Sequence, residues 1–183
     1  LAALPGSERV DAFEEAIWAL QKQFDAIRTE DMNNKAWHWM CLCPVHSYPG
    51  QRLYELVLHD WDIRNDTDQE LHPDALGMSV DILDFRLPFF FNNKPDPALS
   101  GTFRFETERP ARAWAMQCEG GKAAPMSPDE SKYDARIYSS ASDIVLLTTG
   151  RADYAEKKQA GKLRIEGDEG KADALMRALC KPF

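Results

Sequence analysis

The sequence lacks long apolar runs, and it has fewer basic than acidic residues. No stretch approaches the roughly eighteen consecutive apolar residues of a membrane-spanning helix, and no charged-then-apolar leader is present. With 22 basic against 30 acidic residues the net charge is −8, and no Lys/Arg run provides a local patch for phosphate backbones. We therefore expect no nucleic-acid partner, no membrane partner and no signal peptide.

Cysteine is also scarce, and the number of cysteines indicates the redox state of the compartment in which the protein folds. The chain has four cysteines in 183 residues, at positions 41, 43, 118 and 180. These are too few for a disulfide framework in a chain of this size, so we expect a reducing, cytoplasmic setting. A chain of this length forms one large domain or two small ones, and either can bury a real core.

The first half of the sequence is predicted to be helical. Residues 7–28 have apolar side chains at three- and four-residue steps behind Ser7, a suitable N-cap. A second helix is expected over about 51–65 and a third from Pro73, because proline suits a first helical turn. Pro88 is expected to kink or end that third helix.

The second half differs in pattern after the polar, proline-rich segment NNKPDPALSG. Strands are predicted at 102–107, 111–117, 133–140 and 161–168, and an amphipathic helix is predicted at the end of the sequence. We therefore predict an α+β fold. It consists of a helical region over residues 1–92, a linker over 93–101, and a small domain with a mainly antiparallel sheet over 102–183.

The second predicted helix has a narrow polar seam. Within YELVLHDWDIRND (54–66), Glu55, His59 and Asp62 fall in a stripe about 60° wide at about 100° per residue. Apolar residues border the stripe on both sides, whereas a solvated face would be wider and would include Lys or Arg. The pattern indicates a seam that faces the inside of a helical bundle.

The spacing of the seam allows two interpretations. A Glu and a His at positions i and i+4 can present an oxygen and a nitrogen to one metal ion, with Asp62 orienting the imidazole. With one further ligand they would hold zinc and leave a position open for water or substrate. Alternatively, Glu55 and His59 form a hydrogen-bonded pair in the core, which the spacing alone favours because E-x-x-x-H often occurs by chance.

The wider pattern resembles a known family. ELVLHDWDIR is similar to the metal-binding helix of the mycothiol-dependent maleylpyruvate isomerase family, whose N-terminal bundle is DinB-like. SSASDIVLLTTGR, followed by LRIEGD and a final helix, resembles the family's sterol-carrier-like C-terminal domain, so the resemblance covers nearly the whole chain. It implies that Glu55 and His59 bind a divalent metal, usually zinc, with a third ligand, another His, from an earlier helix.

The N-terminal part departs from the family pattern. In the family two helices precede the counterpart of residues 7–28, and the metal-binding His lies on the second of them. We expect either that upstream helices are missing here, which the Leu1 start favours, or that His38 or His46 completes the site. If helices are missing, the apolar face of residues 7–28 should be uncovered or covered by another chain.

Other side chains offer alternative sites. Cys41, Cys43 and His46 in CLCPVH are competent zinc ligands, although a lone C-x-C pair is also found in ordinary loops. The resemblance implies that the C-terminal domain contributes an arginine for a substrate carboxylate, and Arg151 and Arg164 are the catalytic candidates. An ordinary surface position is the alternative for each arginine.

Two functions remain open. In the first, a bound metal lowers the pKa of a low-molecular-weight thiol such as mycothiol. The thiolate then adds to a small-molecule substrate, and the protein is an isomerase or S-transferase. In the second, the chain is a non-catalytic module that holds an apolar small molecule between its two domains. The oligomeric state is not predicted.

Overall fold

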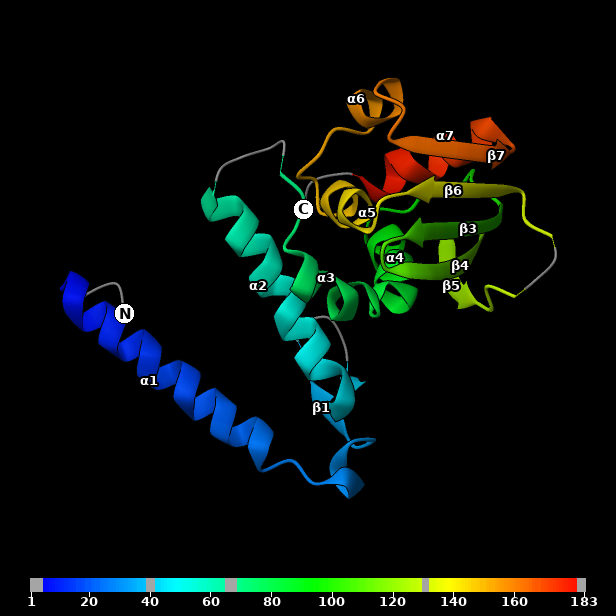
Figure 1. Cartoon of the computed structure of the whole chain (residues 1–183). Coiled ribbons are helices and arrows are strands. Elements are labelled where there is room, and N and C mark those ends of the chain that lie inside the picture. The colour runs from blue at the N-terminus through cyan, green and yellow to red at the C-terminus, as the bar shows by residue number, and fades with distance from the viewer. Residues whose placement is uncertain (1–4, 39–41, 65–68, 130–131, 181–183) are drawn as a thin grey trace. The chain divides into compact units, whose positions relative to one another are not determined.

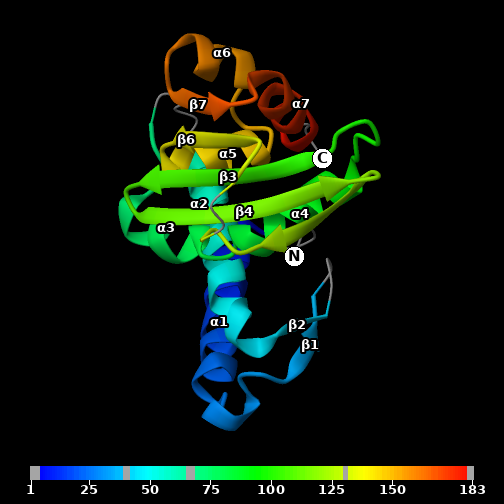
Figure 2. The same ribbon diagram turned by 90° about the vertical axis from the view of Figure 1, so that its right-hand side faces the viewer.

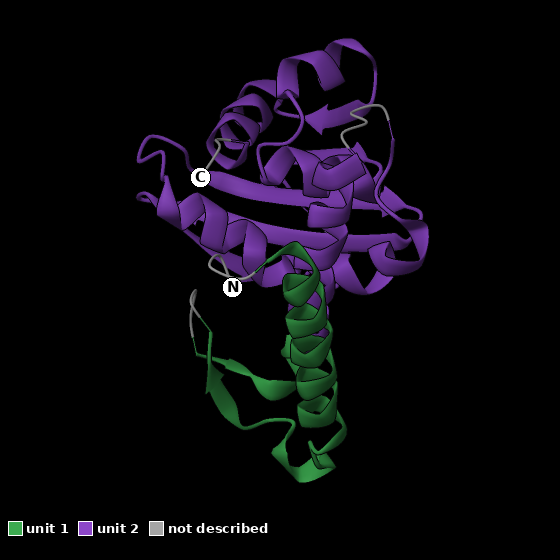
Figure 3. Ribbon diagram, turned by 90° about the vertical axis from the view of Figure 1, so that its left-hand side faces the viewer, with its two compact units in different colours: residues 1–48 green, residues 49–183 purple. Residues whose placement is uncertain are grey.

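The computed structural model describes residues 5–38, 42–64, 69–129 and 132–180. The chain divides into two compact units, residues 1–48 and residues 49–183 (Figure 3). The predicted linker, residues 93–101, lies inside the second unit, where α4 ends at Asn93 and β3 begins at Gly101. The division into domains at this linker stays a prediction.

The first unit consists of a long helix and a short hairpin. Helix α1 (Gly6–Asp25) is followed by η1 (Thr29–Asp31), β1 (Lys35–Trp37), β2 (Leu42–Pro44) and η2 (Val45–Ser47), and the two strands pair antiparallel. The helix has no buried residue, and its apolar face is exposed, with Phe13 at 53%, Ile17 at 43% and Leu20 at 38%. Whether upstream helices cover this face stays a prediction, and the hairpin lies in a segment predicted to be irregular.

The helices of the second unit begin near their predicted positions. Helix α2 (Tyr48–Arg64) contains the polar seam, and α3 (Pro73–Val80) begins at the expected proline. Of the two outcomes expected at Pro88, a kink or a helix end, the end is wrong, because the chain turns at residues 81–82 and α4 (Leu83–Asn93) continues through Pro88. The missing N–H of Pro88 would have bonded the carbonyl of Asp84, an exposed residue, so water can satisfy that carbonyl. The DinB-like bundle stays a prediction.

A five-stranded sheet forms one layer of the second unit (Figures 1 and 2). Its strands are β3 (Gly101–Glu108), β4 (Ala111–Glu119), β5 (Lys122–Met126), β6 (Ala135–Ser139) and β7 (Leu163–Gly167), in the order β5-β4-β3-β6-β7. Neighbouring strands are antiparallel except β3 and β6, which run parallel. The remaining helices are α5 (Ala141–Thr148), α6 (Tyr154–Gln159) and α7 (Glu169–Leu179). The fold is mixed α+β, and β5 and α6 are elements that the sequence did not predict.

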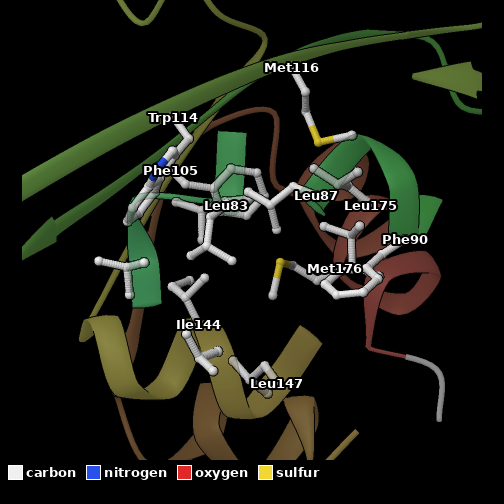
Figure 4. Close-up of a cluster of buried hydrophobic side chains, with 14 of the residues drawn as sticks. Leu83, Leu87, Phe90, Phe105, Trp114, Met116, Ile144, Leu147, Leu175 and Met176 are labelled. Carbon is white, nitrogen blue, oxygen red and sulfur yellow. The ribbon is translucent and has the colours of Figure 1, made fainter. Parts of the chain in front are cut away.

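Helices α4, α5 and α7 cover one face of the sheet with an apolar layer (Figure 4). We use this name for Leu83, Leu87, Phe90, Phe105, Trp114, Met116, Ile144, Leu147, Leu175 and Met176, all of them buried. Full burial of each such side chain contributes about 1.5–3 kcal/mol, so the layer contributes strongly to the stability of the unit. Within the described part of the chain, no helix is long and apolar enough to cross a membrane.

Candidate functional site

The polar seam of α2 lies at the surface of the second unit. The Oε1 atom of Glu55 is 3.1 Å from Nη2 of Arg86, and Nδ1 of His59 is 3.3 Å from Oδ2 of Asp62. The side chains of Glu55 and Asp62 are each 36% exposed, and that of His59 is 63% exposed. With its proton on Nδ1, His59 donates to Asp62 and keeps Nε2 as its acceptor nitrogen. Glu55 and His59 thus have separate partners and do not bond to each other in this geometry.

Arg86 of α4 is the buried member of this group. Its side chain is 3% exposed, lies 3.9 Å over the ring of Tyr54, and donates from Nη2 to Oε1 of Gln51 at 2.6 Å. Burial raises the pKa of the Tyr54 hydroxyl to about 12, so this tyrosine stays neutral beside the guanidinium. The buried Nε2 of Gln51 has no hydrogen-bond partner among the described residues. The arginine therefore links α2 to α4 and fixes the position of Glu55.

Arg151 joins the seam from the other side. It follows α5, where Gly150 adopts a positive φ of 69° that turns the chain back toward α2. Its Nε and Nη2 atoms each donate to Asp62 at 2.7 Å, a bidentate pair. These hydrogen bonds hold the pKa of the Asp62 carboxyl below its ordinary value. The structure therefore brings one of the two predicted catalytic arginines to the predicted metal-binding helix.

Arg164, the other predicted catalytic residue, lies elsewhere. It is on β7, where its guanidinium is 3.6 Å above the ring of Tyr138 and pairs with Glu166. Its side chain is 60% exposed. It also borders a cleft of about 970 Å³ between the β3–β4 turn and the N-terminal ends of α3 and α5. Arg164 thus belongs to the open face of the sheet, and its catalytic role stays a prediction.

The candidate metal ligands are distributed over both units. Among the described residues, no group of three or more His, Cys, Asp and Glu side chains is placed to hold a metal ion. His38 and His46 belong to the first unit, and Nδ1 of His46 lies 3.1 Å from the carbonyl of Met32. Cys43 is buried on β2, and Cys41 lies outside the described residues. The zinc site therefore stays a prediction.

The remaining described cysteines lie in or against the core. Cys118 is buried and Cys180 is partly buried, and burial raises the pKa of each thiol to about 12. Neither is therefore a thiolate near neutral pH, as a cysteine nucleophile would need to be.

A cleft of about 570 Å³ lies between α6 and α7, beside the apolar layer. Its lining includes Ala152, Tyr154 and Cys180, which also pack against the core of the unit. Lys158 and Arg177 stand at the same cleft, and both pair with Asp173. The cleft is thus lined both by charged groups and by apolar groups that pack against the core.

Sequence reasoning missed Arg86 and Gln51. A signal was present, because an arginine within the apolar run FRLPFFF (85–91) cannot be buried without a polar partner. The partner could not be found in this way, since Gln51 is 35 residues away along the chain.

Comparison with known proteins concerns the second half of the chain. Residues 97–180 match the SCP-2 sterol transfer family. Sterol carrier protein 2 like 2 from Aedes aegypti is 18% identical, with 56% of this chain and 97% of that chain covered and a TM-score of 0.44. The sterol carrier protein domain 2 of Helicoverpa armigera is 20% identical, with coverages of 57% and 88% and a TM-score of 0.41.

A larger enzyme contains a similar part. The alkylsulfatase Pisa1 from Pseudomonas sp. is 15% identical, with 51% of this chain covered and a TM-score of 0.43, and this chain spans only 16% of its length. No curated protein sequence matches the chain. The family match at residues 97–180 identifies the C-terminal part of this protein as a sterol-carrier-like domain.

Proposed function

We propose that the second unit is a binding module for an apolar small molecule, such as a lipid or a sterol. The match of residues 97–180 to a sterol transfer family is the observation that carries this proposal. It corresponds to the second of the two functions that the sequence left open, and it requires no metal and no thiol.

The apolar layer supports this function physically. It lies between one face of the sheet and three helices, and it includes Met116 and Met176 (Figure 4). Methionine side chains are flexible and adapt to guests of different shape. The cleft between α6 and α7, bordered by Tyr154 and Cys180, offers a route from the surface to this layer. An apolar ligand would enter there and displace contacts between side chains.

A binding titration tests the proposal. The full chain is titrated with two fluorescent probes, dehydroergosterol and parinaric acid, and we expect saturable binding of at least one probe at one molecule per chain. Met176→Trp fills the layer and should weaken binding at least tenfold, whereas Met176→Ala enlarges the layer and should keep or strengthen it. Both substitutions lower the stability of a packed core, so a loss of stability alone would affect the two variants in the same direction. Probe binding, by contrast, should fall in Met176→Trp and stay or rise in Met176→Ala.

The matched control lies on α2. Leu56 is 44% exposed, so Leu56→Trp should leave probe binding unchanged. The proposal fails if neither probe binds saturably, or if all three variants bind like the wild type.

A second candidate is the metal- and thiol-dependent isomerase or transferase implied by the family resemblance. The position of Arg151 beside Asp62, one turn beyond His59, favours it, because this is an arginine of the C-terminal half next to the predicted metal ligands. In this function Glu55 and His59 would hold the metal, and Arg151 would bind a substrate carboxylate. The test is conversion of maleylpyruvate by the zinc-loaded chain with mycothiol, compared with Arg151→Met.

A further inference from the structure

Strand β7 is an edge strand of the five-stranded sheet. It pairs with β6 on one side and has no other strand beside it in the described chain, while α6 packs against its beginning, where Leu163 is 7% exposed (Figure 1). The N–H of Asp168 donates to the carbonyl of Asp134 on the β6 side at 2.7 Å. Because backbone groups alternate along a strand, those of Leu163 and Ile165 point away from β6. Such an edge is a template for a further strand.

The order of charges along this edge is self-complementary. The segment KLRIEGD (162–168) has basic residues at 162 and 164 and acidic residues at 166 and 168, symmetrically about Ile165. Natural edge strands often carry charged side chains, especially lysine, that discourage pairing with another strand. Here the two halves carry opposite signs, so a copy in the reverse direction is attracted.

The register of such a pair is specified by the charges. When two copies run antiparallel about Ile165, Arg164 lies opposite Glu166 of the second copy, and Lys162 lies opposite its Asp168. If the centre moves by one residue, Arg164 lies opposite Arg164 of the second copy, or Glu166 lies opposite Glu166 of the second copy. Like charges then face each other and repel. In the register about Ile165, the outward N–H and C=O of Ile165 also face the C=O and N–H of Ile165 in the second copy. This is the arrangement of a hydrogen-bonded pair in an antiparallel ladder.

The side chains are already presented for this contact. Arg164 is 60% exposed and Glu166 is 49% exposed, and the two pair with each other on the open face of the sheet. Tyr138 orients both of them, because Arg164 stacks on its ring at 3.6 Å and its hydroxyl donates to Glu166 at 3.0 Å. A second copy therefore meets charges that are fixed in direction, at little further cost in side-chain entropy.

We propose that β7 is a self-association surface, at which two copies of this protein pair antiparallel about Ile165 and join their sheets into one. The two-fold axis stands perpendicular to the sheet, so both helical layers lie on the same side. The apolar layer and the seam on α2 take no part in the contact.

The test uses the mass of the full chain in solution, measured by sedimentation equilibrium up to about 1 mM, so that even a millimolar Kd is detected. The wild type should rise from 20.8 kDa toward twice that mass. Arg164→Glu and Glu166→Arg should each be monomeric alone, because each edge then repels its copy. An equimolar mixture of the two variants should form a heterodimer, since every acidic position then faces a basic one.

The mixture of the two variants distinguishes loss of the β7 contact from other reasons why each variant alone could be monomeric. Loss of the pair between Arg164 and Glu166 within one chain occurs in both variants and is not repaired by mixing. Association that is equal in the wild type and both variants would place the contact elsewhere, for example on the exposed face of α1, and would overturn the proposal. So would a wild type that stays monomeric throughout, or variants that fail to combine although circular dichroism shows them folded.

Discussion

At the scale of single residues, the two carboxylates of the seam are held by arginines that lie far away in the sequence. Glu55 pairs with Arg86 of α4, and Asp62 pairs with Arg151 after α5. The environments differ, since Arg86 is buried whereas Arg151 is 23% exposed. A buried charge that loses its partner costs much more than an exposed one, so the two pairs should respond differently to substitution.

Replacing Arg86 tests the buried pair. Arg86→Met should lower the free energy of unfolding by about 2–3 kcal/mol, because Gln51 loses its hydrogen-bond donor and Glu55 its counter-charge. Urea denaturation of the full chain measures the change. The control is Arg112→Met, whose ion pair with Asp81 is 41% and 49% exposed and is worth at most about 1 kcal/mol. Equal losses in the two variants would contradict the structural role of Arg86.

The pair between Asp62 and Arg151 should make stability depend on pH. The folded pKa of Asp62 lies below its ordinary value of 3.8, so its contribution is fully present above 3.8. That contribution is lost as the pH falls through the folded pKa. Asp62→Asn should therefore be less stable than the wild type at pH 7, and this difference should shrink below about pH 4. A difference in unfolding free energy that stays constant from pH 7 to pH 3 would refute this assignment.

At the scale of elements, α2 presents possible ligands but does not by itself complete a site. A helix sets Glu55 and His59 one turn apart, and a metal ion would need both to leave or share their present partners, Arg86 and Asp62. We therefore predict that Glu55 and His59 change partners when a metal ion is supplied.

The zinc content of the purified chain tests the metal prediction directly. If the metal- and thiol-dependent function holds, the wild type should retain about one zinc ion per chain after dialysis against zinc, and His59→Ala should retain none, because a required nitrogen ligand is lost. Replacing Cys41 and Cys43 together with Ala should leave the content unchanged. The reverse pattern would move the site to the CLCPVH loop, and a wild type that retains no zinc would end the prediction.

The turn between β7 and α7 depends on a glycine. Gly167 has a φ of +96°, and a Cβ built there would lie 2.3 Å from the carbonyl oxygen of Asp134. Gly161 also has a positive φ, +68°, but a Cβ there meets nothing within 4 Å. Gly161→Ala should cost about 1 kcal/mol for the backbone alone, and Gly167→Ala should cost at least about 1 kcal/mol more. Urea unfolding of both variants measures these losses. Equal losses of unfolding free energy would argue against a close approach of Gly167 to the carbonyl of Asp134.

At the scale of the whole molecule, the second unit contains one continuous apolar layer, to which α4 and the sterol-carrier-like part both contribute. A ligand that binds the folded layer and not the unfolded chain stabilises the fold by mass action. At a free ligand concentration 100 times its Kd, the dehydroergosterol or fatty-acid probe that binds should raise the free energy of unfolding by about 2.7 kcal/mol.

Hydrogen exchange should locate this effect. Slower amide exchange is expected in α4, α5 and α7, the helices that cover the layer, and not in α1. Protection confined to the first unit, or no stabilisation at saturating probe, would count against binding in the layer.

Local patterns in the sequence were enough to locate most of the elements. Alternation marked β3 and β4, helical periodicity marked α1 and α7, and Pro73 marked the start of α3, because such signals act within a few residues. The same signals failed at Pro88, where tertiary packing carries α4 through a residue that would end an isolated helix. They also missed β5, whose pairing with β4 follows a turn of two glycines with positive φ.

The seam shows what remained for the tertiary structure to decide. The sequence alone determined that Glu55, His59 and Asp62 share one face of a helix, because a helix repeats every 3.6 residues. Only the folded chain decided that Arg86 and Arg151 reach that face while Arg164 stays on the open sheet, 2 residues from Glu166. Contacts between elements depend on how the chain packs over separations of 31 and 89 residues, and no local pattern records them.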